Sequence, residues 1–248
     1  MSTEIPKYTW SFSSLGLFEC PKHYEVVRAK KLIPSQQSES GNEGARLHEL
    51  IEAYLEKDIW SDELKKWKKV LDIYKAKNGV CEVEYGFKWQ TLEQFLDSPV
   101  STYLEKDGDR YLVRCEADDP DRWYLGYIDW MKIDGENCEL VDWKTGKIKI
   151  SKQLELYAWL VFTCHPQVMR VKATFHWLNF GDQTNDWFER KDKNRLFLSF
   201  KETLEQIDNC YRTDTWPEDP GIIGKNGRGA HCRFCPVTTE YCSQGVTL

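Results

Sequence analysis

The sequence has no hydrophobic run long enough to cross a bilayer. Its longest apolar stretch, 156–164, is about half of the roughly 20 residues that a membrane-spanning helix needs. Residues 1–20 lack both a basic segment and a continuous apolar segment, which predicts that there is no cleavable export signal. Internal repeats, low-complexity blocks and Pro/Gly-rich linkers are also absent. We therefore expect a single domain over 1–248 and no membrane partner.

An excess of positive charge is missing as well. The 34 Lys and Arg are outnumbered by 40 Asp and Glu, which gives a net charge of -6. This balance excludes a surface that is basic throughout, but it is compatible with a local basic groove. It also leaves many carboxylates, the group that binds hard divalent cations.

Aromatic residues and cysteines are abundant. With 11 Trp, 12 Tyr and 11 Phe, 14% of the chain is aromatic and 41% is hydrophobic, so a sizeable folded core is expected and disorder is excluded as the main state. Nine cysteines without an export signal predict an intracellular, reducing compartment, the cytoplasm or, for a viral protein, the host cytoplasm. In that setting thiols serve as core residues or metal ligands.

The hydrophobic pattern alternates between helix and strand periods, which predicts an α/β fold with mixed strands. A short helix is expected over 18–30, followed by a polar loop over 34–43. The other expected helices cover 44–56, 61–77, 152–163 and 194–211, and the expected strands cover 80–90, 110–116, 125–134, 138–148, 170–179 and 187–190. Gly135, Glu136 and Asn137 form the predicted turn of a hairpin.

This hairpin brings two acids and a lysine together. Asp129 lies on its first strand, and Asp142 and Lys144 lie two residues apart on the second, so both point to one face. Two carboxylates suit Mg²⁺ or Mn²⁺, and a lysine can stabilise charge on a phosphate. Gly126 and the Thr-Gly-Lys turn after Lys144 would let a phosphate approach closely. A simpler interpretation is a salt pair on a solvated sheet.

Four segments in this order resemble a known family. LGYIDW, VDWKTGK and QLELY, preceded by GARLHELIE, are similar to the RecB-type branch of the PD-(D/E)XK nucleases, which includes AddB-like and CRISPR adaptation nucleases. The resemblance implies a restriction-endonuclease-like core, a central mixed β-sheet flanked by helices. It also implies that Asp129, Asp142 and Lys144 are the signature catalytic residues.

The resemblance assigns further residues to the site. It implies that His48 ligates or borders the metal and that Gln153 and Tyr157, the Q-x-x-x-Y pair, contribute to catalysis from one side of a helix. Glu84 matches an upstream acid directed at the same metals. Glu82, two residues earlier on the same face, is an alternative to it.

Three cysteines are concentrated near the end of the chain. Cys232, Cys235 and Cys242 follow a C-x2-C-x6-C pattern in a segment with few apolar residues, and tetrahedral thiolate coordination needs a fourth ligand. FECPKHY is similar to the family's F-x-x-C-P-x-x-Y segment, which implies that Cys20 completes a 4Fe-4S site joining 1–30 to 224–248. Spacing alone also allows structural Zn²⁺, with His231 in place of one cysteine.

These features together lead to a functional hypothesis. The resemblance implies a metal-dependent DNA exonuclease, acting at single-stranded ends in repair, recombination or replication. One alternative is an iron-sulfur module that binds DNA without cutting it, although the intact Asp129, Asp142 and Lys144 set argues against this. A CRISPR spacer-trimming nuclease is the other alternative.

Overall fold

The computed structural model describes residues 5–34, 39–98, 103–223, 229–232 and 235–245. The chain forms two compact units, one from 1–5 with 37–198 and the other from 6–36 with 199–248. The expected single nuclease domain stays a prediction. Residues 1–30 and 224–248, which we expected to join at the cysteines, fall mainly in the second unit.

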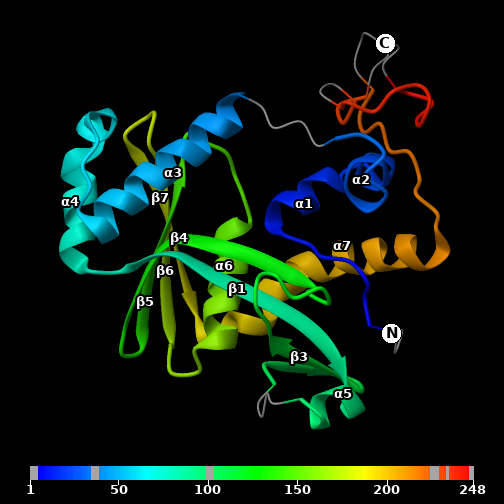
Figure 1. The fold of residues 1–248 in the computed structure, drawn as a ribbon, viewed down its shortest axis with the longest axis horizontal. Coiled ribbons are helices and arrows are strands. Elements are labelled where there is room, and N and C mark those ends of the chain that lie inside the picture. The colour runs from blue at the N-terminus through cyan, green and yellow to red at the C-terminus, as the bar shows by residue number, and fades with distance from the viewer. Residues whose placement is uncertain (1–4, 35–38, 99–102, 224–228, 233–234, 246–248) are drawn as a thin grey trace. The chain divides into compact units, whose positions relative to one another are not determined.

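The first unit is built on a seven-stranded sheet with the order β2-β3-β1-β4-β5-β6-β7, drawn in Figure 1. Its strands are β1 (Val80–Thr91), β2 (Glu105–Asp107), β3 (Arg110–Arg114), β4 (Tyr124–Asp134), β5 (Asn137–Lys144), β6 (Arg170–Trp177) and β7 (Asp182–Glu189). The predicted α/β class with mixed strands is confirmed, because β5 and β6 are parallel while every other pair of neighbours is antiparallel.

The parallel pair β5–β6 requires a crossover, and α6 (Gln153–Cys164) provides it. Every residue from 156 to 163 in this helix is buried, so its apolar character extends around the whole helix rather than along one stripe. A helix enclosed on all sides has little freedom to shift. The side chains in its first turn are therefore held in a fixed position.

A second layer consists of α3 (Glu39–Lys57), a 3-10 helix (Asp62–Trp67) and α4 (Lys68–Lys77). Their apolar faces share one core with residues of β4 and β5, including Leu47, Ile51, Leu71, Trp130 and Trp143. Burial of each such side chain contributes about 1.5–3 kcal/mol to stability. This core holds α3 against the strands that carry the predicted acids.

Some element boundaries differ from the predictions. α3 begins at residue 39, inside the expected loop 34–43, because extending an amphipathic helix by another turn costs little once it has formed. β5 ends at Lys144, four residues before the predicted end, and β7 begins earlier than expected. The short α5 (Leu92–Leu96) and β2 were not predicted, since their patterns span too few residues to show a period.

The second unit combines both ends of the chain. It contains α1 (Phe12–Leu17), α2 (Pro21–Tyr24), a π-helical turn (Glu25–Ala29) and the part of α7 (Lys193–Thr213) from residue 199 onward. Tyr8 stacks on Tyr211 at 4.7 Å between ring centroids, and Tyr24 stacks on Trp216. These aromatic contacts join the N-terminal segment to α7 and the residues after it.

Within the described part of the chain, no helix is both long and apolar enough to traverse a bilayer.

Candidate active site

Three carboxylates lie in a row across adjacent strands of the first unit. In the β1–β4 register Cys81 pairs with Trp130 and Val83 with Ile128, which places Glu82 opposite Asp129. The β4–β5 register pairs Trp130 with Val141 and, continued by one residue, sets Asp129 opposite Asp142. Opposed residues project from the same face of a sheet. The fold therefore gathers Glu82, Asp129 and Asp142, although they are far apart in sequence.

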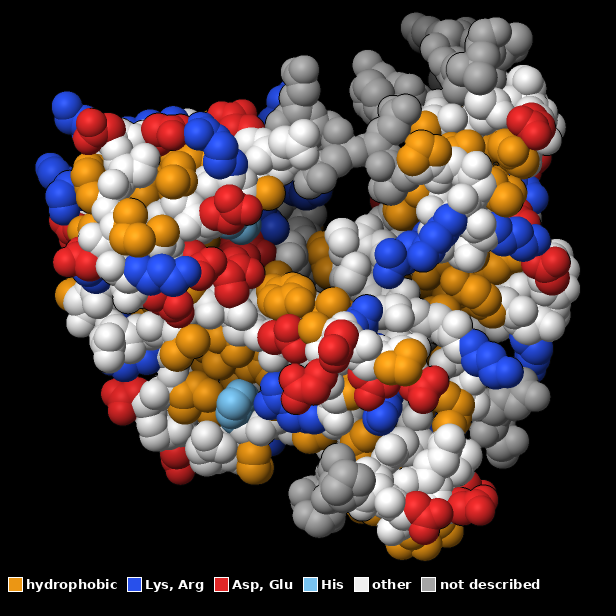
Figure 2. Space-filling view, in the orientation of Figure 1, with side chains coloured by type: hydrophobic (Ala, Val, Ile, Leu, Met, Phe, Trp, Pro, Cys, Tyr) orange, Lys and Arg blue, Asp and Glu red, His pale blue; other side chains and the backbone are white. Residues whose placement is uncertain are grey.

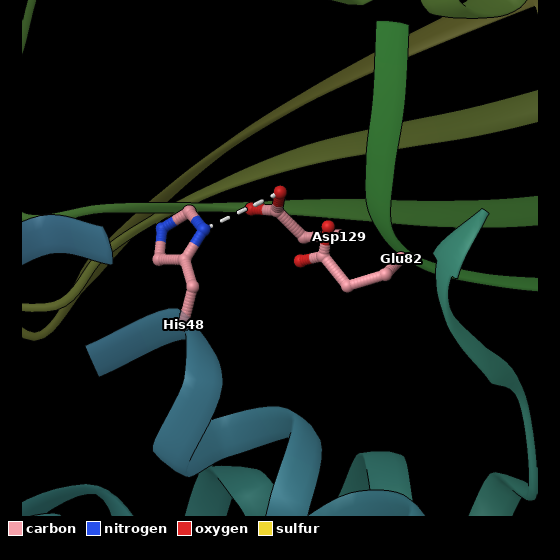
Figure 3. Close-up of side chains that lie close together, drawn as sticks. All are labelled: His48, Glu82 and Asp129. Carbon is pink, nitrogen blue, oxygen red and sulfur yellow. Dashed lines mark ion pairs between the residues drawn. The ribbon is translucent and has the colours of Figure 1, made fainter. Parts of the chain in front are cut away.

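Asp129 is the centre of this row. It is 8% exposed, and its Oδ2 accepts a 2.7 Å hydrogen bond from the backbone N–H of Trp143 on β5. Its Oδ1 lies 3.5 Å from Nδ1 of His48, which α3 presents from the covering layer. Figure 3 shows the imidazole and the carboxylates of Asp129 and Glu82 turned toward one another.

His48 is oriented through its second ring nitrogen. Nε2 donates a 2.8 Å hydrogen bond to the carbonyl oxygen of Trp143. This bond holds the ring so that Nδ1 faces the carboxylates. A histidine that ligates a metal typically donates its other N–H to a carbonyl or carboxylate in this way, so Nδ1 is the atom available to a cation.

Glu82, rather than Glu84, joins this group. One ligand atom each from His48, Glu82 and Asp129 lies within 4.8 Å of the others. Glu82 has φ +47, a left-handed backbone that is unfavourable for a residue other than glycine and is typical of functional sites. The carboxylate of Glu84 accepts a hydrogen bond from Tyr127 instead. The sequence allowed Glu82 as an alternative to Glu84. No local sequence pattern predicts the left-handed backbone at Glu82, so only the structure shows which acid joins the group.

The other predicted residues form a closed ring of contacts. Nζ of Lys144 lies 2.6 Å from Oδ2 of Asp142 and donates to Oε1 of Gln153 at 2.9 Å. Gln153 donates to the Tyr157 hydroxyl at 2.6 Å, and that hydroxyl donates to Oδ1 of Asp142 at 3.1 Å. The i, i+4 spacing on α6 thus places Gln153 and Tyr157 against the end of β5. Each member of the ring limits the movement of the next.

The electrostatics of the group favour a cation. Burial, together with the charge of Asp129, raises the pKa of Asp142 and raises the pKa of Glu82 to about 7. Burial by itself would lower the pKa of His48, but the hydrogen bond and charge of Asp129 outweigh it and raise this pKa to about 9. Asp142 Oδ2 is buried and has no hydrogen-bond partner in the described chain apart from its ion pair with Lys144. Oxygen donors and one imidazole are a ligand set that Mn²⁺ or Mg²⁺ can accept.

The surface around the group is acidic, as expected of a cation site. Figure 2 shows red acidic side chains gathered beside a pale blue histidine where Figure 1 draws α3 next to β4.

The expectation that Gly126 lets a phosphate approach is wrong. The space above Gly126 is filled by the hydroxyl of Tyr124 and cannot admit a phosphate, whereas nothing lies within 4 Å of the open side of Gly146.

Comparison with known proteins identifies the family. The model of the PD-(D/E)XK nuclease superfamily matches residues 9–242, nearly the whole chain. The chain belongs to this superfamily. Members use divalent metals, in accord with the candidate site at His48, Glu82 and Asp129. No curated protein matches the chain.

Two solved structures resemble this nuclease-superfamily chain. A protein designated SSO0001 has a TM-score of 0.40 and 13% identity, covering 100% of this chain and 90% of that chain. A protein from Eubacterium rectale, provisionally assigned as an exonuclease, has a TM-score of 0.41 and 10% identity, covering 88% of this chain and 92% of that chain.

The second unit of the nuclease contains a pocket at its cysteines. All four predicted ligands, Cys20, Cys232, Cys235 and Cys242, contribute to its lining, and His231 lies beside them. Burial, together with the charges of neighbouring groups that include Cys20 and Cys232, raises the pKa of Cys242. The backbone N–H of Asp219 donates to Sγ of Cys20 at 3.4 Å. The fold therefore brings residue 20 to the C-terminal thiols.

All four cysteines lie within the described residues, and no three of their sulfurs lie within 4.8 Å of one another.

Proposed function

We propose that the protein is a metal-dependent DNA exonuclease of the RecB-type branch, hydrolysing phosphodiester bonds at single-stranded ends. The observation that carries this proposal is the row of Glu82, Asp129 and Asp142, flanked by His48 and by the ammonium of Lys144. A protein that only binds DNA gains nothing from placing three acids, of which Asp129 and Asp142 are buried, beside a polyanion. Their repulsion is useful where a cation neutralises them and contacts the phosphate.

The ligand set defines which residues would hold Mg²⁺ or Mn²⁺. His48 Nδ1, Glu82 and Asp129 present convergent donor atoms, and Asp142 adds a buried oxygen at the adjacent strand. The bound cation would polarise the scissile phosphate and favour the ionised form of a nearby water. In our proposal Glu82 takes the place that the resemblance assigned to Glu84.

The remaining residues position and stabilise the reacting groups. Lys144 places a fixed positive charge beside Asp142, where it can stabilise the negative charge that develops on the phosphate oxygens. Gln153 keeps the lysine directed at the site, and Tyr157 holds the second oxygen of Asp142. The ring therefore assembles the site before substrate arrives, which lowers the cost of organising it during the reaction.

The finer cofactor assignment is a 4Fe-4S cluster held by Cys20, Cys232, Cys235 and Cys242. The observation that supports it is that the four thiols line a single pocket. The amide that donates to Cys20 Sγ also fits, because such bonds stabilise cluster thiolates.

The direct test is digestion of end-labelled linear single strands, linear duplexes and circular single strands with Mg²⁺ or Mn²⁺. We expect cleavage of the linear single strand, resistance of the circle, and no cleavage in EDTA. Asp129→Asn and Asp142→Asn should each abolish cleavage. Asp134→Asn, an exposed acid at the far end of β4, is the matched control and should cut normally. Wild-type protein that binds DNA and never cuts it would support the binding-module alternative instead.

A further inference from the structure

The connection between β5 and α6 begins at one predicted catalytic residue and ends at another. It leaves Lys144 and returns at Gln153. Thr145 is held at its start, because its carbonyl accepts a 2.7 Å hydrogen bond from Asn179 and its side chain lies close to Gly44 of α3. At its end, Ser151 Oγ accepts a hydrogen bond from the N–H of Gln153. The position of this connection relative to the site is therefore well determined.

Its middle is exposed throughout. All residues over 146–150 are exposed, and the side chain of Ile150 is 102% exposed while Ile148 is 49% exposed. Lys147 and Lys149 alternate with these isoleucines and form no ion pair or hydrogen bond within the described chain. The two isoleucines leave apolar surface in water that contact with another molecule would bury, and the two lysines are free to pair with anions of that molecule.

We propose that 146–150, here called the Lys-Ile loop, holds the unpaired DNA strand next to the scissile phosphate. The two lysines contact backbone phosphates, and the two isoleucines pack against the faces of unstacked bases. This inference rests on the proposed nuclease function and names the part of the substrate that the loop contacts.

The chemistry of the loop selects this occupant. Alternating cationic and apolar side chains match a single strand, whose charged backbone and apolar base faces are both accessible. In an intact duplex the base faces are stacked and unavailable to isoleucine, although apolar side chains do insert where a duplex is opened. The unobstructed Gly146 lets a phosphate approach the backbone where the loop leaves Lys144. The loop is a local basic element in a chain of net charge -6, so charge complementarity favours a polyanion here.

The first experiment pairs protein variants with modified DNA. Binding of fluorescein-labelled single strands to the full-length protein is measured with Ca²⁺ in place of Mg²⁺, using an intact oligonucleotide and a series with abasic nucleotides at successive positions. We expect Ile148→Ser with Ile150→Ser to weaken binding roughly fivefold to tenfold. Abasic nucleotides at the contacted positions should weaken wild-type binding to a similar extent and should add little to the loss in the double variant.

The matched control is Ile59→Ser with Ile73→Ser, which removes two exposed isoleucines of the same unit, 59% and 56% exposed, and should bind like wild type. Equal abasic losses in wild-type protein and in the loop variant would overturn the base contact. An unchanged affinity in the loop variant would also overturn the base contact, and it would indicate that the isoleucines contact a protein partner instead.

The second experiment tests the lysines through salt dependence. Each phosphate contact on a single strand contributes about 0.7 to the slope of log affinity against log salt, so Lys147→Gln with Lys149→Gln should lower that slope by about 1.4. Lys65→Gln with Lys69→Gln, two exposed lysines near α4, is the control and should leave the slope unchanged. An unchanged slope in the loop variant would refute the phosphate contact. Wild-type protein that neither binds nor cuts DNA would instead refute the nuclease proposal itself.

Discussion

At the scale of single residues, Lys144 and Asp142 depend on each other. The carboxylate is 2% exposed, and the lysine ammonium at 2.6 Å is the charge that compensates it. In the proposed mechanism this charge faces the reacting phosphate and is one of several cations that DNA can contact. Lys144→Ala should therefore lower the single-turnover rate by about 100-fold or more while changing DNA affinity less than about threefold. Lys132→Ala, on the neighbouring strand β4, is the control. A loss confined to affinity would contradict the role of Lys144.

The titration of His48 predicts how the metal-free protein responds to pH. Its pKa is raised from 6.5 to about 9, so its contribution to stability is fully present below about pH 6.5 and is lost as pH rises through about 9. Glu82, whose pKa is raised to about 7, acts in the same direction, since its ionisation above pH 4.5 disfavours the folded state.

In EDTA, the unfolding free energy should therefore fall between pH 6.5 and 9, and His48 should account for about 2 kcal/mol of that fall. Denaturant titrations at the two pH values should show a smaller fall for His48→Gln than for wild type. The Asp134→Asn control should follow the wild-type curve. An identical pH dependence in wild type and His48→Gln would show that His48 keeps its ordinary pKa.

At the scale of elements, Arg190 fastens the end of α6. Its guanidinium donates to the carbonyls of Val168 at 2.6 Å, Phe162 at 2.9 Å and His165. The carbonyl of Phe162 lies in the last turn of α6, where carbonyls have no partner within the helix, and those of His165 and Val168 follow it, so one arginine satisfies three carbonyls at the helix end. Arg190→Met should lower the unfolding free energy by about 2–4 kcal/mol. Thermal unfolding measures this loss, and Arg195→Met, at an exposed arginine, should change the free energy by less than about 0.5 kcal/mol.

At the scale of the whole molecule, the cysteine pocket joins residues that are far apart in sequence. The proposed cluster would close a loop of about 210 residues between Cys20 and Cys232, and the entropy of closing such a loop corresponds to about 5 kcal/mol. Protein purified without oxygen should be brown and contain about four irons per chain. Cys20→Ser should lose most of this iron and melt at a lower temperature, whereas Cys115→Ser, in the first unit, should keep it.

Iron content and melting temperature of the two variants decide between the alternatives for the pocket. Colourless protein with stoichiometric zinc would establish the competing metal. Full iron retention in Cys20→Ser would mean that another group is the fourth ligand, and His231 lines the same pocket.

The sequence by itself determined the α/β class and the hairpin that carries Asp129, Asp142 and Lys144. Strand alternation and a short glycine turn are local properties, so their pattern predicts which residues share a face. The i, i+4 spacing of Gln153 and Tyr157 is equally local, and the structure places Gln153 against Lys144 and Tyr157 against Asp142. Four ordered motifs also indicated the superfamily that the chain belongs to.

Only the tertiary structure decided which acid completes the row and how the strands meet. Glu82 and Glu84 share a face in any regular strand, and the left-handed backbone at Glu82 arises where β1 meets Asp129 of β4. The position of Thr145, directly after β5, likewise involves Asn179 and Gly44, residues distant from it in the sequence. Such contacts form through packing between distant segments, and a local sequence pattern carries no record of them.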